Sequence, residues 1–195
     1  MVFILYKWCQ MSLEYAILGF LNYHPYSGYD LKKAFDVSIR HFWPADQSQI
    51  YRTLGRLTEQ GWAEVEVVEQ TDRPDRKVYS ITPAGRTALR SWLSSPIPQQ
   101  EARSAALIQV FFAGQLSDEE ILAKFEEATQ AMRSILDRYQ HVPLEIDEYV
   151  TTIGSPREEF FWMLTLELGI KSVQTQIEWM ESVMRRIRNK EHPSK

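Results

Sequence analysis

The sequence has one cysteine and few glycines and prolines. Its 195 residues include one cysteine, Cys9, which excludes a disulfide framework and a zinc site built on cysteines. Eight glycines and nine prolines without a triplet period exclude collagen-like and linker-like chains. With 44% hydrophobic and 25% charged residues, the composition is typical of a folded globular protein with one domain or two small ones.

Long apolar runs are missing as well. No stretch reaches the roughly 20 apolar residues that a membrane-spanning helix requires, so we expect no membrane partner. The N-terminal run Val2–Tyr6 is short and follows no basic segment, which fits a secretory signal poorly. A reducing compartment, the cytoplasm, agrees with both observations and with the single cysteine.

The sequence offers little material for catalysis or metal binding. None of its four histidines pairs with another at the spacing of metal ligands. Adjacent glutamates such as Glu119 and Glu120 lie on predicted helices, where neighbours point about 100° apart and form no acid/base pair. No glycine-rich phosphate loop is present, so we predict no enzymatic activity, no cofactor and no metal site. The histidines are His24, His41, His141 and His192.

Negative charge is concentrated in the second half of the chain. The net charge is −4 and the isoelectric point is about 5.6, which taken alone disfavours a nucleic-acid partner. Residues 1–95 carry eleven Lys and Arg against ten Asp and Glu, a net of +1, whereas residues 96–195 carry eleven against sixteen, a net of −5. Because a DNA-binding surface depends on local charge, the first half remains compatible with nucleic acid.

Two prolines in the segment 94–100 interrupt every periodic pattern and predict a boundary between two domains. Residues 1–10 precede Met11, which resembles a second start site, and they form either an N-terminal extension or an arm packed on the first domain. We expect an extension at 1–10, a first domain at 11–95, a connecting segment at 96–116, a helical domain at 117–190 and a tail at 191–195.

The first domain begins with the pattern of three helices. Ser12 is the expected cap of the first helix, whose apolar residues recur at helical spacing, and the segment 27–30 opens the second helix. Asp46 caps the third helix, with Gln49 three residues later as in a capping box.

The apolar period then changes from that of a helix to that of a strand. Gly61 is the expected stop of the third helix, and alternation predicts strands at 63–69 and 76–81 that form a hairpin. Thr82 and Pro83 start a fourth helix as cap and first helical residue. Three helices, a hairpin and a further helix are the order of a winged helix-turn-helix domain.

Four motifs make a resemblance specific. LEYAILGFL at 13–21, SGYDL at 27–31, QIYRTLGRL at 49–57 and KVYSITPAG at 77–85 follow in this order. Each is weak alone, but together they closely resemble PadR-family transcriptional regulators, in the longer subgroup shared with virulence-gene activators. The resemblance covers residues 12–95.

The resemblance implies both a fold and a function. The expected fold is mainly α, a winged helix-turn-helix domain with a small β-hairpin wing followed by an all-helical, coiled-coil-like dimerisation domain. The expected function is that of a sequence-specific DNA-binding regulator of the bacterial cytoplasm. We expect a homodimeric repressor that binds a double-stranded DNA operator and is relieved by a small aromatic effector.

The third predicted helix fits the major groove of DNA, where side chains read base edges. Its apolar face holds Ile50, Leu54 and Leu57, so its polar face points outward. Glutamine pairs with adenine and arginine with guanine, although an ordinary solvated face is the alternative reading. The predicted contacts on this helix are Gln47, Ser48, Gln49, Tyr51, Arg52 and Arg56.

Further DNA contacts are expected from the wing and the second helix. The wing carries three cationic residues, Arg73, Arg76 and Lys77, and nearby aspartates offset part of their charge. Wings of this fold contact phosphates or the minor groove of DNA. The second helix of a helix-turn-helix crosses the DNA backbone, so its polar residues are predicted phosphate contacts, although Tyr29 fits the core equally well. These residues are Ser27, Tyr29 and Lys32.

The second domain shows the pattern of two long helices. A capping box at 117–120 starts the first, which Pro143 is expected to end, and Ser155 caps the second. Apolar residues of the second helix recur at spacings of three and four over about three heptads. This seam forms either a core within one chain or a pairing between two chains, and we favour the pairing because PadR relatives dimerise. Its residues are Met163, Leu166, Ile170, Val173, Ile177, Met180, Met184 and Ile187.

Two other functions remain open for the same fold. The protein is alternatively a winged-helix protein-interaction module that binds no DNA, or a transcriptional activator. Some PadR relatives bind small aromatic molecules near the dimer interface, and five aromatic side chains of this sequence either line such an effector site or form the core of the interface. They are Trp8, Phe111, Phe112, Trp162 and Trp179.

Overall fold

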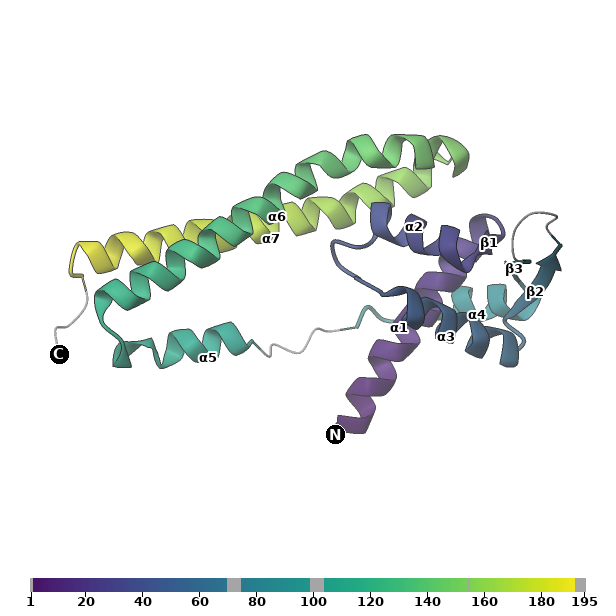
Figure 1. Cartoon of the computed structure of the whole chain (residues 1–195), viewed down its shortest axis with the longest axis horizontal. Helices are drawn as coiled ribbons and strands as arrows, with labels where there is room; N and C mark the ends of the chain where they lie inside the picture. Colours follow the sequence, from purple (N-terminus) through teal and green to yellow (C-terminus); the bar gives the residue numbers. More distant parts are fainter. Residues whose placement is uncertain (1, 70–74, 99–103, 154, 192–195) are drawn as a thin grey trace. The chain divides into compact units, whose positions relative to one another are not determined.

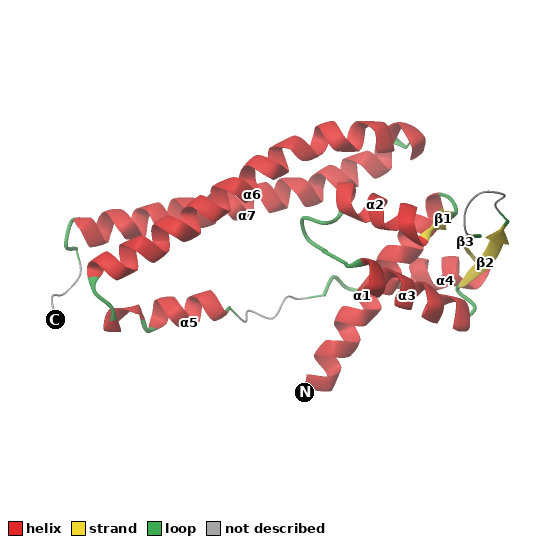
Figure 2. Ribbon diagram, in the orientation of Figure 1, coloured by secondary structure: helices red, strands yellow, loops and turns green. Residues whose placement is uncertain are grey.

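The computed structural model describes residues 2–69, 75–98, 104–153 and 155–191, and the side chains of all of these except 2–11 and 143–153. The described chain is mostly helical with one small antiparallel sheet, as Figures 1 and 2 show, and the predicted fold class is confirmed. It divides into two compact units, Met1–Ile97 with Glu148–Gly154 and Pro98–Asp147 with Ser155–Lys195. No helix among the described residues has the length and apolar character needed to cross a bilayer.

Among the described residues up to position 97, the first unit forms four helices and three strands. The helices are α1 (Val2–Tyr23), α2 (Gly28–Ser38), α3 (Gln47–Glu59) and α4 (Pro83–Leu93). The strands are β1 (Tyr26–Ser27), β2 (Ala63–Val68) and β3 (Arg76–Ile81), in the spatial order β1-β3-β2. The predicted hairpin is confirmed as the antiparallel pair β2–β3, with Val65 opposite Tyr79.

The prediction that Ser12 caps the first helix is wrong. Helix α1 is continuous from Val2 to Tyr23, as Figure 1 shows, so Ser12 lies within it and not at its start. The segment 2–12 contains neither proline nor glycine. Because propagating a helix costs far less than starting a new one, a single capping residue does not interrupt it.

The core of the first unit is built from the apolar faces of its helices. The predicted inward residues Ile50, Leu54 and Leu57 of α3 are fully buried, together with Leu31 of α2 and Ile17 of α1. These side chains belong to one cluster that also takes in Tyr79 and Ile81 of β3. The helices and the sheet therefore share one core, which holds α3 against α1 and α2.

A glycine contact fixes the start of α4 beside the hairpin. Thr82 caps the helix as predicted, since its hydroxyl oxygen accepts from the Gly85 amide at 3.1 Å and its hydroxyl donates to the Gly61 carbonyl at 2.7 Å. A Cβ at Gly85 would lie 2.1 Å from the carbonyl oxygen of Trp62, a backbone atom that cannot turn away. Only glycine allows this close approach.

The second unit contains two short and two long helical segments. They are α5 (Ala105–Phe111), the 3₁₀ turn η1 (Ala113–Gln115), α6 (Asp118–Ile153) and α7 (Pro156–Arg188). The predicted capping box of α6 is present, because Glu120 N donates to Ser117 Oγ at 3.2 Å and Ser117 N donates to Glu120 Oε2 at 2.8 Å.

One expectation for the second unit is wrong, and its connecting segment holds helices that the sequence did not predict. The segment 96–116 contains α5 and η1, and Ser104 caps α5 by accepting from Leu107 N at 3.2 Å. Pro143 does not end α6, which runs on to Ile153. Proline removes one helical hydrogen bond, but long helical stretches on both sides retain theirs and tolerate the defect.

Helices α6 and α7 lie side by side and antiparallel. Arg188 of α7 pairs with Glu126 of α6 at 2.6 Å, and Glu181 pairs with Arg133 at the same distance. Seven residues forward along α6 thus match seven residues backward along α7, which is two helical turns on each helix. Figure 1 shows the two helices along each other, α6 in green and α7 in yellow-green.

The heptad seam of α7 is buried in its central part. Leu166, Val173, Ile177, Met180 and Met184 are buried, whereas the other three seam residues are half-buried. Met180 and Met184 pack with Phe125 of α6 in the same chain. These two therefore contribute to a core within one chain, and a seam between two chains stays a prediction. The half-buried residues are Met163, Ile170 and Ile187.

Candidate nucleic-acid interface

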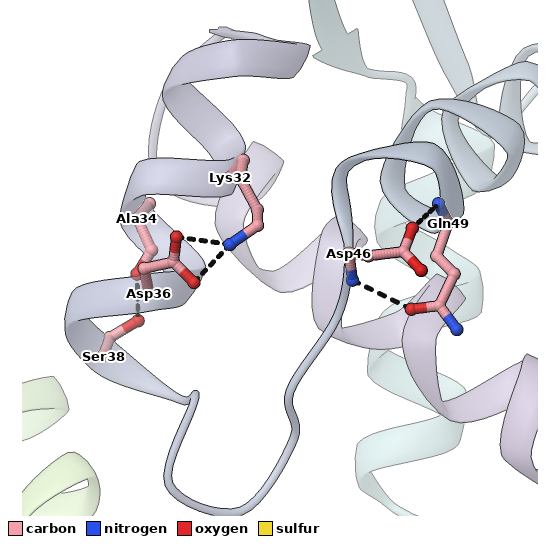
Figure 3. A network of polar contacts seen from close by, with 6 residues as sticks. All are labelled: Lys32, Ala34, Asp36, Ser38, Asp46 and Gln49. Atoms are coloured by element: carbon pink, nitrogen blue, oxygen red, sulfur yellow. Dashed lines mark hydrogen bonds and ion pairs between the residues drawn. The ribbon is translucent and has the colours of Figure 1, made fainter.

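The first turn of α3 is fixed by the predicted capping box. The Asp46 carboxylate accepts from the Gln49 amide at 2.7 Å, and the Gln49 side-chain oxygen accepts from the Asp46 amide at 2.9 Å (Figure 3). Ser48 donates its hydroxyl to the same carboxylate at 2.7 Å. The bond from Ser48 and the bond from the Gln49 amide hold the pKa of the Asp46 carboxyl below its ordinary value. These three hydrogen bonds fix the backbone at the start of α3 relative to the Asp46 side chain.

The structure brings five of the six predicted recognition residues together on the exposed side of α3. Arg52 lies one turn beyond Ser48 and its Nε donates to the Ser48 carbonyl at 3.3 Å. The opposite side of the helix, with Thr53 and Leu54, is buried. The exposed residues are Gln47, Ser48, Gln49, Tyr51 and Arg52.

Arg56, the sixth predicted residue, is half-buried, with 34% of its side chain exposed, and reaches across to α1. Its Nε donates to Glu14 Oε1 of α1 at 3.1 Å, and its Nη2 donates to Thr53 Oγ1 at 3.1 Å. Glu14 is buried at 8% exposure. The guanidinium is thus engaged with two groups of its own domain.

Tyr51 rests on the beginning of α2. A Cβ at Gly28 would lie 2.5 Å from a ring carbon of Tyr51, so the ring packs directly over the glycine backbone. The ring remains 42% exposed, which leaves one side open to a partner. Glycine at this position allows the close approach of α2 to the recognition helix.

Of the three residues at α2 that were predicted to contact DNA, Ser27 already has its hydrogen-bond partners within the domain. Ser27 is buried and caps α2, since its hydroxyl donates to Asp30 Oδ2 at 2.6 Å and accepts from the Asp30 amide at 3.2 Å. A contact from Ser27 to a phosphate would require this cap to open. The cap therefore counts against Ser27 as a DNA contact.

The other two predicted contacts on α2 lie at the surface. Tyr29 is 56% exposed and carries the Lys33 ammonium 4.6 Å from its ring centroid, so its core alternative is wrong. Lys32 pairs with the Asp36 carboxylate one turn along the helix (Figure 3). Both side chains remain candidates for the DNA backbone.

The wing contributes two of its three predicted cations to the described surface. Arg76 of β3 pairs with Asp30 of α2, and Lys77 is exposed beside it. Burial raises the pKa of the Asp30 carboxyl, but the bonds from Ser27 and Arg76 and the nearby positive charges outweigh burial and hold that pKa below its ordinary value. Arg73 lies outside the described residues.

The neighbouring strand β2 is acidic. Glu64 and Glu66 are exposed along it. This charge disfavours phosphate contact along β2 and leaves Arg76 and Lys77 of β3 as the cationic side chains of the described part of the wing. Among the side chains that the structure describes, no three metal-ligating groups come together.

The second unit has an apolar groove of about 650 Å³ between α5 with η1 and the pair α6–α7. Phe112 and Trp179, two of the predicted effector-site aromatics, line it, together with Phe125 and Met180. Phe111 and Trp162 are not among its lining residues, and the side chain of Trp8 lies outside the described part of the chain. The groove has the size and the aromatic lining suited to a small planar molecule.

Comparisons with known families match both units. Residues 17–91 match the family described as transcriptional regulator PadR-like, and residues 102–188 match the family described as virulence activator alpha C-term. The chain is 32% identical to the probable transcriptional regulator Rv1176c of Mycobacterium tuberculosis, over 92% of this chain and 100% of that protein. It is 28% identical to the negative transcriptional regulator PadR of Bacillus subtilis, over 88% of this chain and 95% of that protein.

Solved structures show the same similarity. Bacillus subtilis PadR in complex with operator DNA superimposes with a TM-score of 0.76 and 29% identity, over 90% of this chain and 99% of that chain. The structure of the same Bacillus protein in complex with p-coumaric acid gives a TM-score of 0.72 and 27% identity, over 92% and 97%. The comparisons of sequence and of structure thus both match nearly the whole length of this chain.

Proposed function

The chain belongs to the PadR-like family of transcriptional regulators, and from this premise we propose that it is a homodimeric repressor that binds a specific DNA operator. The resemblance predicted from the four motifs is confirmed, and the family's members are regulators rather than enzymes. The observation that carries the proposal is the exposed polar side of α3, held at its first turn by the Asp46–Gln49 capping box.

The docking follows from the geometry of the first unit. In helix-turn-helix proteins the N-terminal residues of the recognition helix reach base edges in the major groove. Gln47 and Ser48 occupy that first turn, and Arg52 follows one turn later on the same side. The proposed phosphate contacts are Lys77 and Arg76 of the wing and Tyr29 of α2, and such contacts fix the register of the domain on DNA without reading sequence.

Repression is favoured over activation by the relative from Bacillus subtilis, which is named a negative regulator. Activation is the second candidate, because the second unit matches a family named for virulence activators. A reporter gene behind the bound promoter separates the two. Deleting the regulator raises expression under repression and lowers it under activation.

A homodimer is supported by the apolar surface of the second unit. Phe111 is 81% exposed, Leu168 68% and Phe160 60%, and large exposed apolar side chains of this kind mark surfaces that another chain covers. Two winged domains held together in this way would read half-sites roughly one helical turn, or a multiple of it, apart.

A small aromatic effector is supported by two observations. The Bacillus relative is known in complex with p-coumaric acid, and the groove of this chain's second unit is lined by Phe112 and Trp179. An effector releases the operator when it binds the non-binding form of the dimer more tightly than the binding form. Because an operator lies on the chromosome, we place the protein in the bacterial cytoplasm.

The proposal is tested by fluorescence anisotropy with a labelled duplex that the full-length protein has enriched from a random library. We expect sub-micromolar binding that survives competitor DNA and weakens steeply with salt. Arg52→Gln weakens it, whereas the matched control Arg90→Gln, which removes the same charge from the exposed side of α4, does not. Binding no tighter than to competitor DNA would contradict the proposal and favour a protein-interaction module.

A further inference from the structure

The charged pair that joins α1 to the recognition helix is the least expected feature of the first unit. Glu14 is the one charged residue among the buried side chains that the structure describes. A carboxylate taken out of water requires compensation by a partner. Here the partner is Arg56 of α3, 42 positions later in the chain.

The geometry gives Arg56 two anchors inside the domain. Its Nε lies 3.1 Å from Glu14 Oε1 on α1, and its Nη2 lies 3.1 Å from the hydroxyl of Thr53, a residue of α3 that is 1% exposed. The planar guanidinium donates to both groups at once, which fixes its orientation better than a single contact would.

Arg52 makes an informative contrast. The two arginines are four positions apart on one helix, a rotation of only about 40°, and sequence reasoning places them on the same DNA-facing side. Yet Arg52 is exposed and its Nε donates to the Ser48 carbonyl of its own helix, whereas Arg56 reaches across to another helix. The structure therefore assigns different surroundings to two residues of the same type.

We propose that Glu14 and Arg56 are a positioning pair, which sets the recognition helix against α1, and that Arg56 acts on DNA binding through Glu14 and not by contacting the operator. This inference rests on the proposed function.

The experiment compares full-length variants with the enriched duplex at several salt concentrations and at a temperature where every variant is folded. Glu14→Gln and Arg56→Gln are expected to weaken operator binding to a similar degree, about 5-fold or more, and the double variant is expected to be no worse than either. Their salt slopes equal that of the wild type. Lys77→Gln, at the exposed wing residue that we propose contacts a phosphate, is the comparison that lowers the slope, by about 0.9 for each phosphate left without a cationic partner.

Two further variants keep the test independent of folding defects. Arg56→Lys retains the charge but not the fork, so it weakens binding if Arg56 is a positioning residue and leaves binding nearly unchanged if it is a simple phosphate contact. The exchange Glu14→Arg with Arg56→Glu restores an attraction between α1 and α3 and is expected to recover part of the affinity that the single variants lack.

Three results would overturn the inference. Arg56→Gln that lowers the salt slope, with Glu14→Gln binding at least as tightly as the wild type, would make Arg56 a DNA contact. Variants that melt earlier but bind DNA with unchanged affinity would make the pair a purely stabilising one. Failure of the wild type to enrich any sequence would overturn the proposed function together with the inference, whereas the first two results leave that function intact.

Discussion

The two units of the chain differ in how they bury their apolar side chains. In the first unit, sixteen buried residues from α1–α4 and the sheet form one cluster. In the second unit, the corresponding cluster among the described side chains has three buried members, Phe125, Met180 and Met184, while several large apolar residues lie exposed. The described part of the second unit thus has the smaller core of its own, and we propose that another chain or a ligand covers its exposed apolar side chains. On this proposal, reading DNA and joining subunits are tasks of different units.

The strongest way to test this difference is to remove a side chain from each core. Leu54→Ala, in the fully buried centre of the first unit, is expected to lower the free energy of unfolding by about 3–5 kcal/mol, because surrounding side chains leave a cavity that cannot close. Met184→Ala in the smaller cluster is expected to cost about 2 kcal/mol. Urea denaturation followed by circular dichroism measures both. Equal losses would show that the second unit is as well packed as the first.

Introducing a negative charge tests whether the exposed apolar side chains of the second unit form the dimer interface. Phe111→Glu and Leu168→Glu are expected to weaken dimerisation by about 2 kcal/mol or more each, since an interface buries such side chains away from water. Sedimentation velocity at several protein concentrations measures the dimer. Val67→Glu on the exposed part of β2 is the matched control in the first unit and leaves the dimer intact. If only the Val67→Glu variant dissociated into monomers, the dimer interface would lie in the winged domain.

The reading surface of the first unit is tested at Gln47. Gln47→Ala is expected to reduce the preference for the selected operator over a one-base variant by about 1–3 kcal/mol, because it would remove the bidentate contact to a base that we propose for this residue. The salt slope of binding is expected to stay unchanged, since an uncharged glutamine neutralises no phosphate. Gln174→Ala, an exposed glutamine of α7, serves as control and alters neither quantity. A Gln47 variant with unchanged preference would leave sequence reading to other residues of α3.

The smallest expected effect concerns the cap of α3. Asp46→Ala is expected to lower the midpoint of thermal unfolding by about 2–4 °C, because the Gln49 amide loses its acceptor. The pKa of Asp46 is lowered by folding from its ordinary value of 3.8, so its contribution to stability is present above that value and is lost as the pH falls through the lower folded pKa. Thermal scans of both proteins from about pH 2 to pH 7 should therefore converge at the acidic end. A constant difference at all pH values would mean that the charge of Asp46 plays no part.

Much of the first unit could be predicted from local rules. Caps at Asp46 and Thr82 and the apolar face of α3 depend on residues close in sequence, and each is present in the structure. The short strand β1 escaped prediction because two residues carry no period, and only pairing with β3 defines it. The start of α1 was not predicted correctly, because a serine is a common helix cap but also occurs inside helices. The sequence around Ser12 does not distinguish the two positions.

The candidate interface was less predictable than the fold for a related reason. A helical wheel places Arg52 and Arg56 on neighbouring positions, but it holds no information about Glu14, which meets Arg56 only through the packing of α1 on α3. Ser27 was predicted at a phosphate, whereas its hydroxyl caps α2. In both cases a residue type suited to DNA is used within the domain, and only tertiary structure distinguishes the two uses.

The most direct test of the central claim is the sequence that the full-length protein selects from a library of random duplexes. We predict one enriched motif with two-fold symmetry, whose half-sites lie about 10–10.5 base pairs apart or a multiple of that distance, since two copies of α3 must enter the major groove on the same side of the DNA. Enrichment of no sequence above competitor DNA, or of a single unrepeated half-site, would contradict the claim that the chain reads an operator as a dimer.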